Sequence, residues 1–180
     1  MLTEVQKHIL ERVAGLVKMP DGAINIRSDG KKAYRHNSEH IKIEGKTDKD
    51  ASISASTGTK GETVYIPVVI TADIKDMVYN DFFVGEGADV TIVAGCGIHN
   101  DSCNESRHDG IHTFYLEKNA RVHYVEKHYG EGLGQGKNVM NPETIVYLGE
   151  GASMTMDTTQ IKGVDDTKRY TKVVCQATGR

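Results

Sequence analysis

The first stretch of the chain has apolar residues at helical spacing. A helix is expected over Leu2–Lys18, where Thr3 and Gln6 stand at the spacing of a capping box. The segment 19–22, Met-Pro-Asp-Gly, predicts a turn that ends this helix. No comparably strong helical pattern follows, so we expect the rest of the chain to be β. The apolar positions on the predicted helical face are Leu2, Val5, Ile9, Val13, Leu16 and Val17.

Three later windows of the sequence share one frame, with an alanine at the same place in each. These alanines are Ala88, Ala120 and Ala152, so the spacing is 32 residues twice over. On both sides of each alanine, apolar and polar residues alternate, which is the period of a half-buried strand. A glycine or asparagine precedes each alanine and suits a tight bend. Each repeat is therefore predicted to be strand, turn, strand and polar loop, and segment 50–55 is a weaker fourth copy, offset by 37 residues.

Two architectures fit these repeats: a β-solenoid, in which each repeat is one coil, and an antiparallel sandwich of hairpins. Equal spacing favours the solenoid, because repeats that cannot bury their own apolar face gain a core by stacking in phase. We therefore predict an all-β fold, a β-helix with a short N-terminal α-helix. Residues 1–20 would form the helix and 21–180 the β-helix core, and the helix is expected to cover one open end of the solenoid.

Composition and charge exclude several classes of protein. The chain has 180 residues, a net charge of -3 and a pI near 6.2, so a nucleic-acid partner is not expected. Apolar runs such as 66–70 are far shorter than the roughly 18 residues of a membrane span, so we expect no membrane partner. Glu4, Lys7 and His8 stand where a signal peptide would be apolar, which predicts a cytoplasmic protein. Three cysteines, an odd number, indicate reduced thiols.

Histidines and cysteines gather in one part of the chain. Their spacings do not match the paired cysteines of zinc ribbons. Cys96 and His128, however, are 32 residues apart, so stacked coils would place them on adjacent rungs about 4.8 Å apart, a distance suited to a shared metal ion. The alternative is that Cys96 is a small apolar core residue. Of the others, His99, Cys103 and His108 are expected to be solvated loop residues, His112 a core histidine in phase with Phe114 and Leu116, and His123 an outward residue.

No catalytic motif is present in the sequence. The glycine-rich segment 130–138 lacks the first glycine of a phosphate-binding loop, since Glu131 stands there, and Asn138 follows Lys137 where Ser or Thr is needed. It is predicted to be a loop between repeats. No nucleophile-elbow sequence accompanies any serine, so a hydrolase is not indicated.

Several long phrases of the sequence resemble the short SufB/SufD-type proteins of iron-sulfur cluster assembly. They are VYNDFFVG (78–85), VTIVAGCGIHN (90–100), HDGIHTF (108–114), NARV (119–122), YVEKHYGEG (124–132) and QIKGVD (160–165). The resemblance extends over nearly the whole chain. It implies a right-handed parallel β-helix, in agreement with the solenoid that the repeats predict.

The resemblance also implies a scaffold role in the SUF machinery, so the chain itself is not expected to be an enzyme. Members of that family assemble with an ABC-type ATPase (SufC-like), with another SufB/SufD-type chain and with a cysteine desulfurase system, so a homo- or hetero-oligomer is expected. A transient iron-sulfur cluster forms on the full complex from persulfide sulfur, iron and electrons. ATP hydrolysis belongs to the partner, which accords with the lack of a nucleotide loop in this sequence.

The chain differs from the family at its C-terminal end. Family members continue into further coils and a helical segment that contain their functional cysteine, histidine and glutamate, so none of these roles is carried over to a residue of this sequence. We expect a fragment or a short member whose open coil after 173–174 self-associates. Two alternatives stay open: a metal-binding β-fold enzyme that uses Cys96 and His128, and a purely structural protein-interaction module.

Overall fold

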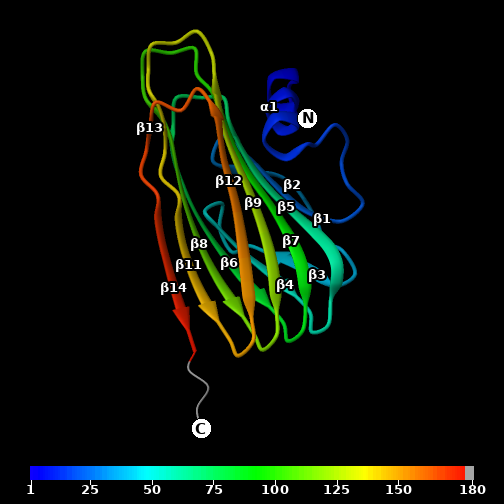
Figure 1. Ribbon diagram of the computed structural model, residues 1–180. Helices are drawn as coiled ribbons and strands as arrows, with labels where there is room; N and C mark the ends of the chain where they lie inside the picture. Colours follow the sequence, from blue (N-terminus) through cyan, green and yellow to red (C-terminus); the bar gives the residue numbers. More distant parts are fainter. Residues whose placement is uncertain (177–180) are drawn as a thin grey trace.

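The computed structural model describes residues 1–176, which form a β-solenoid of about four turns and one short helix (Figure 1). The predicted β-helix with an N-terminal helix is confirmed. Successive strands alternate between two facing sheets, named sheet A and sheet B. Sheet A contains, in spatial order, β12 (Ser153–Lys162), β9 (Arg121–Glu131), β7 (Asp89–His99), β5 (Lys60–Ile70), β1 (Ala23–Ser28) and β2 (Lys31–His36).

Sheet B is built in the same way from the intervening strands. It contains β13 (Asp166–Thr167), β10 (Asn138–Met140), β8 (Ser106–Leu116), β6 (Lys75–Val84), β4 (Asp50–Ala55) and β3 (Ile41–Glu44), with β11 (Glu143–Leu148) beside β8 and β14 (Tyr170–Cys175) beside β11. Strands of successive coils pair in parallel, while β2 and β3 pair antiparallel to β1 and β4. The antiparallel sandwich is thereby excluded.

The register of the strands reproduces the 32-residue repeat. Asp89 pairs with Arg121, and Arg121 pairs with Ser153 on the next coil. Each predicted turn links a strand of sheet B to a strand of sheet A, so the turn advances the coil and does not close a hairpin. The residue before each repeat alanine has positive φ, as the turn requires: Gly87 at 66°, Asn119 at 57° and Gly151 at 68°.

The assignment of segment 50–55 as a fourth copy of the strand after the turn is wrong. This segment is β4, which pairs with β6 in sheet B and therefore corresponds to the strand before the turn. The equivalent strand after the turn is β5, in which Val64 pairs with Ile92 at a spacing of only 28 residues. The spacing is shorter because the connection from β5 to β6 is shorter than the loops of the later coils. The 32-residue period therefore does not hold in the first coil.

The core lies between the two sheets. Side chains at alternate positions of central strands such as β6 and β8 point inward, and Phe82 stacks on Phe114 of the next coil with ring centroids 4.5 Å apart. Stacking of like residues from coil to coil buries a continuous apolar column. The largest fully buried side chains of this column are Tyr124, Phe82, Phe114, Ile41 and Ile92.

The N-terminal helix, α1 (Glu4–Ala14), begins with the predicted capping box. Thr3 accepts a hydrogen bond from the backbone of Gln6, and the Gln6 side chain accepts one from the backbone of Thr3. The helix ends at Ala14, earlier than the predicted Lys18, because Gly15 adopts a left-handed conformation with φ of 67° and closes the last turn. This helix is too short and too polar to cross a membrane.

Helix α1 does not cover an open end of the solenoid, so that prediction is wrong. It packs against the outer face of sheet A over β5, β7 and β9, beside the upper half of the strands in Figure 1. Two glycines of β7 leave room for the helix on this face. A Cβ on Gly95 would lie 2.5 Å from the carbonyl oxygen of Val13, and a Cβ on Gly97 would overlap the side chain of Ile9. The starts of the two sheets are covered by β2 and β3 instead.

Candidate functional site

Polar side chains interrupt the apolar interior at one level of the solenoid. They surround a cavity of about 20 Å³ between the two sheets, enough for one water molecule or ion. Sheet A contributes Cys96 from β7 and Glu126 and His128 from β9, and sheet B contributes His108 and His112 from β8. All five residues are buried, which is rare for so many titratable groups unless they are paired or functional.

The stacking of Cys96 and His128 on adjacent rungs is confirmed, since the two residues are register partners of β7 and β9. His128 has a polar neighbour at each ring nitrogen: Nδ1 lies 2.9 Å from Oε1 of Gln160, and Nε2 lies 3.2 Å from Oε1 of Glu126. Within residues 1–176, no three His, Cys, Asp or Glu side chains already converge to hold a metal ion. A metal role for Cys96 and His128 stays a prediction.

Glu126 is the centre of a buried charge network. It accepts hydrogen bonds from the Tyr124 hydroxyl and from Arg169, and it contacts His128. Burial works to raise the pKa of this carboxyl, but the hydrogen bond and charge of His128 and the charge of Arg169 outweigh it and hold the pKa well below its usual range. The cavity is therefore bordered by a carboxylate that stays ionised near neutral pH.

A second buried network joins three strands on the other side of the cavity. The Arg27 guanidinium of β1 lies 3.0 Å from Oδ1 of Asp76, and Nδ1 of His108 lies 3.0 Å from Oδ2 of the same carboxylate. Burial opposes ionisation of Asp76, but its hydrogen bond to His108 and the charges of His108 and Arg27 keep its pKa below the usual value. Because a carboxylate only accepts, Nδ1 of His108 is the donor. The other nitrogen, Nε2, is then available on the cavity side.

The prediction that His108 is a solvated loop residue is wrong. His108 is buried in β8, at an inward position in the same alternation as His112 and Phe114. Sequence reasoning placed the start of this strand too late. The alternation of the sequence does indicate the inward position of His108, because every second residue from 108 to 116 lies on one face of the strand. Asp76, Arg27 and Glu126 were missed altogether, since charged residues in a strand pattern are read as outward.

His112 is a core histidine, as predicted, and its Nδ1 has no hydrogen-bond partner among the described residues. Burial lowers the pKa of His112 to about 4, so its imidazole is neutral at physiological pH. Gly110 lies between the two histidines of β8. A Cβ at Gly110 would be 3.0 Å from Nε2 of His112 and 3.1 Å from Nε2 of His108, so both nitrogens border the space that this glycine leaves open.

Titration of His112 predicts a loss of stability in mild acid. The unfolded chain takes up a proton near pH 6.5 whereas folded His112 stays neutral down to about pH 4. Above pH 6.5, the free energy of unfolding therefore does not depend on His112. Below pH 6.5, it falls by about 1.4 kcal/mol per pH unit, which amounts to about 2 kcal/mol at pH 5. Urea unfolding of metal-free protein between pH 7 and 5 measures this slope. His112→Gln should remove that component, and an unchanged slope in this variant would contradict the assignment.

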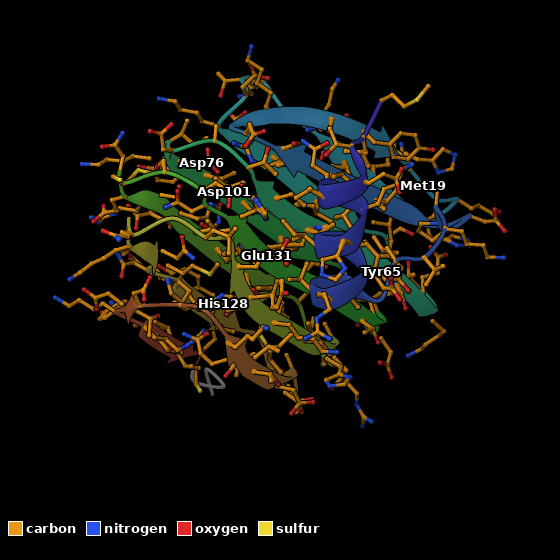
Figure 2. All side chains as sticks on the ribbon, turned by 90° about the horizontal axis from the view of Figure 1, so that it is seen from above. Met19, Tyr65, Asp76, Asp101, His128 and Glu131 are labelled. Atoms are coloured by element: carbon orange, nitrogen blue, oxygen red, sulfur yellow. The ribbon has the colours of Figure 1, made fainter. Side chains whose placement is uncertain are left out.

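The remaining predicted residues lie outside the cavity. The prediction that His99 is a solvated loop residue is wrong, because His99 is the last residue of β7 and is mostly buried. Its Nδ1 lies 3.0 Å from Glu131 and its Nε2 lies 2.8 Å from Asp101. Cys103 is exposed, and His123 points outward to Asp157, as predicted. Figure 2 shows Asp76 and His128 on different coils and on the same side of α1, with Asp101 and Glu131 between them in this view.

The predicted loop between repeats is confirmed for 132–137, but Gly130 and Glu131 end β9 and Asn138 begins β10. The glycines of this loop have a packing role. The backbone amides of Gly134 and Gly136 donate to the carbonyls of Asn100 and Ser102 in the loop of the preceding coil. A Cβ on either glycine would collide with that backbone. The glycines thus permit close stacking of successive loops, and no phosphate site is needed to explain them.

Comparison with family models, with curated proteins and with solved structures found no match to this chain.

Proposed function

We propose that this chain is a scaffold subunit of SUF-type iron-sulfur cluster assembly. The observation that carries the proposal is the parallel β-solenoid itself, because the phrases that resemble SufB/SufD-type proteins imply that fold. These phrases map onto consecutive coils: 78–85 lies in β6 and the turn that follows, 90–100 in β7, and 124–132 in β9. The resemblance therefore follows the repeating architecture of the molecule, coil after coil.

In this role the chain works inside a complex. A SUF ABC-type ATPase, a second SufB/SufD-type chain and a cysteine desulfurase system are the proposed partners, and the iron-sulfur cluster is the cargo. Within residues 1–176, β12 pairs only with β9 and β14 only with β11, so each presents one unpaired edge to solvent. Strand addition at such an edge joins solenoids through main-chain hydrogen bonds, which suits an assembly of similar chains.

Anaerobic reconstitution tests the proposal. The full chain would be co-expressed with its SUF-type ATPase, and the purified complex supplied with cysteine desulfurase, cysteine and ferrous iron. We expect a stable complex by size-exclusion chromatography with light scattering, and iron and acid-labile sulfide in the eluate. An unrelated ABC ATPase is the control and should not bind. A folded chain that binds no SUF ATPase and acquires no sulfide would overturn the proposal.

One alternative, a metal-dependent enzyme that uses Cys96 and His128, is supported by the position of these two residues as register partners on adjacent coils. Such an enzyme needs a stoichiometric ion and loses activity in Cys96→Ala and His128→Ala. The scaffold proposal expects both variants to retain the ATPase partner. Cys96→Ala should lose only about 1 kcal/mol of stability, and His128→Ala should lose more, because it takes a partner from the buried Glu126 carboxylate. A purely structural module would bind a partner without iron or sulfide, so the same assays distinguish the three functions.

A further inference from the structure

Two imidazole nitrogens border the same small space inside the solenoid. Nε2 of His108 and Nε2 of His112 lie within about 6 Å of each other, on either side of the position that a Gly110 side chain would fill. His108 is held by the bond from its Nδ1 to Asp76, the arrangement that orients metal-binding histidines and leaves Nε2 as the ligand. Buried His112 has an unpartnered Nδ1. Among the described residues no hydrogen bond occupies either Nε2, so these two nitrogens border the space left by Gly110 without a protein partner.

A sulfur donor faces them from the opposite sheet. Cys96 of β7 is a free, buried thiol on the wall of the same cavity. Burial and the charges of Asp76 and Glu126 raise the pKa of this thiol, so without a cation it stays protonated. A metal ion changes that balance, because it binds the thiolate and the proton leaves for solvent.

We propose that this cavity binds one divalent transition-metal ion, zinc or iron(II), through Nε2 of His108, Nε2 of His112 and Sγ of Cys96. Mixed imidazole and thiolate donors are the set that such ions prefer over magnesium or calcium. The cavity of about 20 Å³ has room for one ion. The three donors do not yet converge, so binding draws them together by side-chain rotation.

The charges around the cavity are balanced before an ion binds. The ionised carboxylates of Asp76 and Glu126 are each already paired with an arginine, so the Cys96 thiolate itself compensates the charge of a bound ion. His128 is left out of the ligand set because Gln160 and Glu126 occupy both of its nitrogens. The site is therefore different from the pair that the repeat spacing predicts, and it stands whether or not the chain serves cluster assembly.

Cobalt(II) and zinc titrations of the chelator-treated full chain test the site. We expect one equivalent of either ion per chain, with a thiolate-to-cobalt charge-transfer band in the near ultraviolet and visible bands typical of four-coordinate cobalt. Cys96→Ser should remove the charge-transfer band while visible bands remain. Zinc should also raise the thermal unfolding midpoint of the wild-type protein.

Gly110→Ala is the sharpest variant, because it fills the space and removes no ligand. Its methyl group would lie 3.0 Å and 3.1 Å from the two Nε2 atoms, and we expect at least a tenfold loss of affinity with an unchanged circular dichroism spectrum. Gly22→Ala is the matched control, since a Cβ there would make an ordinary 3.4 Å contact, and should bind normally.

Three outcomes would overturn the site. The first is a wild-type chain that retains no ion at micromolar concentrations. The second is Gly110→Ala binding as tightly as wild type. The third is loss of the ion in His99→Gln, which would place the ion at the surface cluster of His99, Glu131 and Asp101. A double variant, His108→Gln with His112→Gln, provides an independent check on the nitrogen ligands and should bind no ion.

Discussion

Replacing Gly95 with alanine is expected to detach α1 from the solenoid. The new methyl group would lie 2.5 Å from the carbonyl oxygen of Val13 and 2.7 Å from its Cβ, so the helix backbone itself has to move. Helix docking buries three large side chains, Ile9, Leu10 and Val13, each worth about 1.5–3 kcal/mol. Complete loss of docking would therefore cost about 5 kcal/mol of unfolding free energy. Urea unfolding, together with protease sensitivity of residues 1–20, measures the effect.

The neighbouring glycine supplies the control for this prediction. Alanine at position 97 would overlap a methyl group of Ile9, which is a side-chain atom and can be removed. We expect Ile9→Ala to relieve part of the penalty of Gly97→Ala, so the double variant should be more stable than the sum of the two single changes implies. Val13→Ala should give no such relief to Gly95→Ala. If Val13→Ala relieves Gly95→Ala as much as Ile9→Ala relieves Gly97→Ala, the backbone contact at Gly95 is not the cause of the stability loss in Gly95→Ala.

Removing the carboxylate of Asp76 should be the most damaging change inside the solenoid. Arg27 and Asp76 have side chains only 5% and 4% exposed, so Asp76→Ala leaves a guanidinium buried without its counter-ion. Breaking a buried pair in this way costs about 3–5 kcal/mol. The same change frees His108 from the bond that orients it. Equilibrium unfolding in urea at pH 7 gives the magnitude directly.

Two comparisons check that the effect of Asp76→Ala arises from burial. Glu150→Ala removes an exposed pair with Lys118, 3.8 Å apart, and should cost less than about 1 kcal/mol. The pKa of Asp76 is held below its ordinary 3.8, so its stabilising effect is complete above that pH and is lost as the pH falls further. The difference in unfolding free energy between wild type and Asp76→Ala should therefore become smaller below about pH 3.8. A constant gap would show that lost packing, and not lost charge, is responsible.

The site illustrates where strand alternation is informative and where it is not. The 32-residue spacing correctly placed Cys96 beside His128, because register partners in a solenoid are one period apart. The same alternation placed His112 inside. It did not place His108 or Asp76 inside, because these two are buried together with Arg27 in one ion-pair network whose members come from strands distant in sequence.

Sequence alone determined the β-solenoid, the turns at the repeat alanines and the capped N-terminal helix. All three follow from local periodicity, turn chemistry or capping, which act over a few residues. Tertiary structure alone decided where the helix lies, since two outward glycines of β7 form its docking surface only once the strand direction is fixed. It also decided which polar groups share the cavity. Those contacts join strands of facing sheets, and no sequence spacing fixes which inward positions meet across the core.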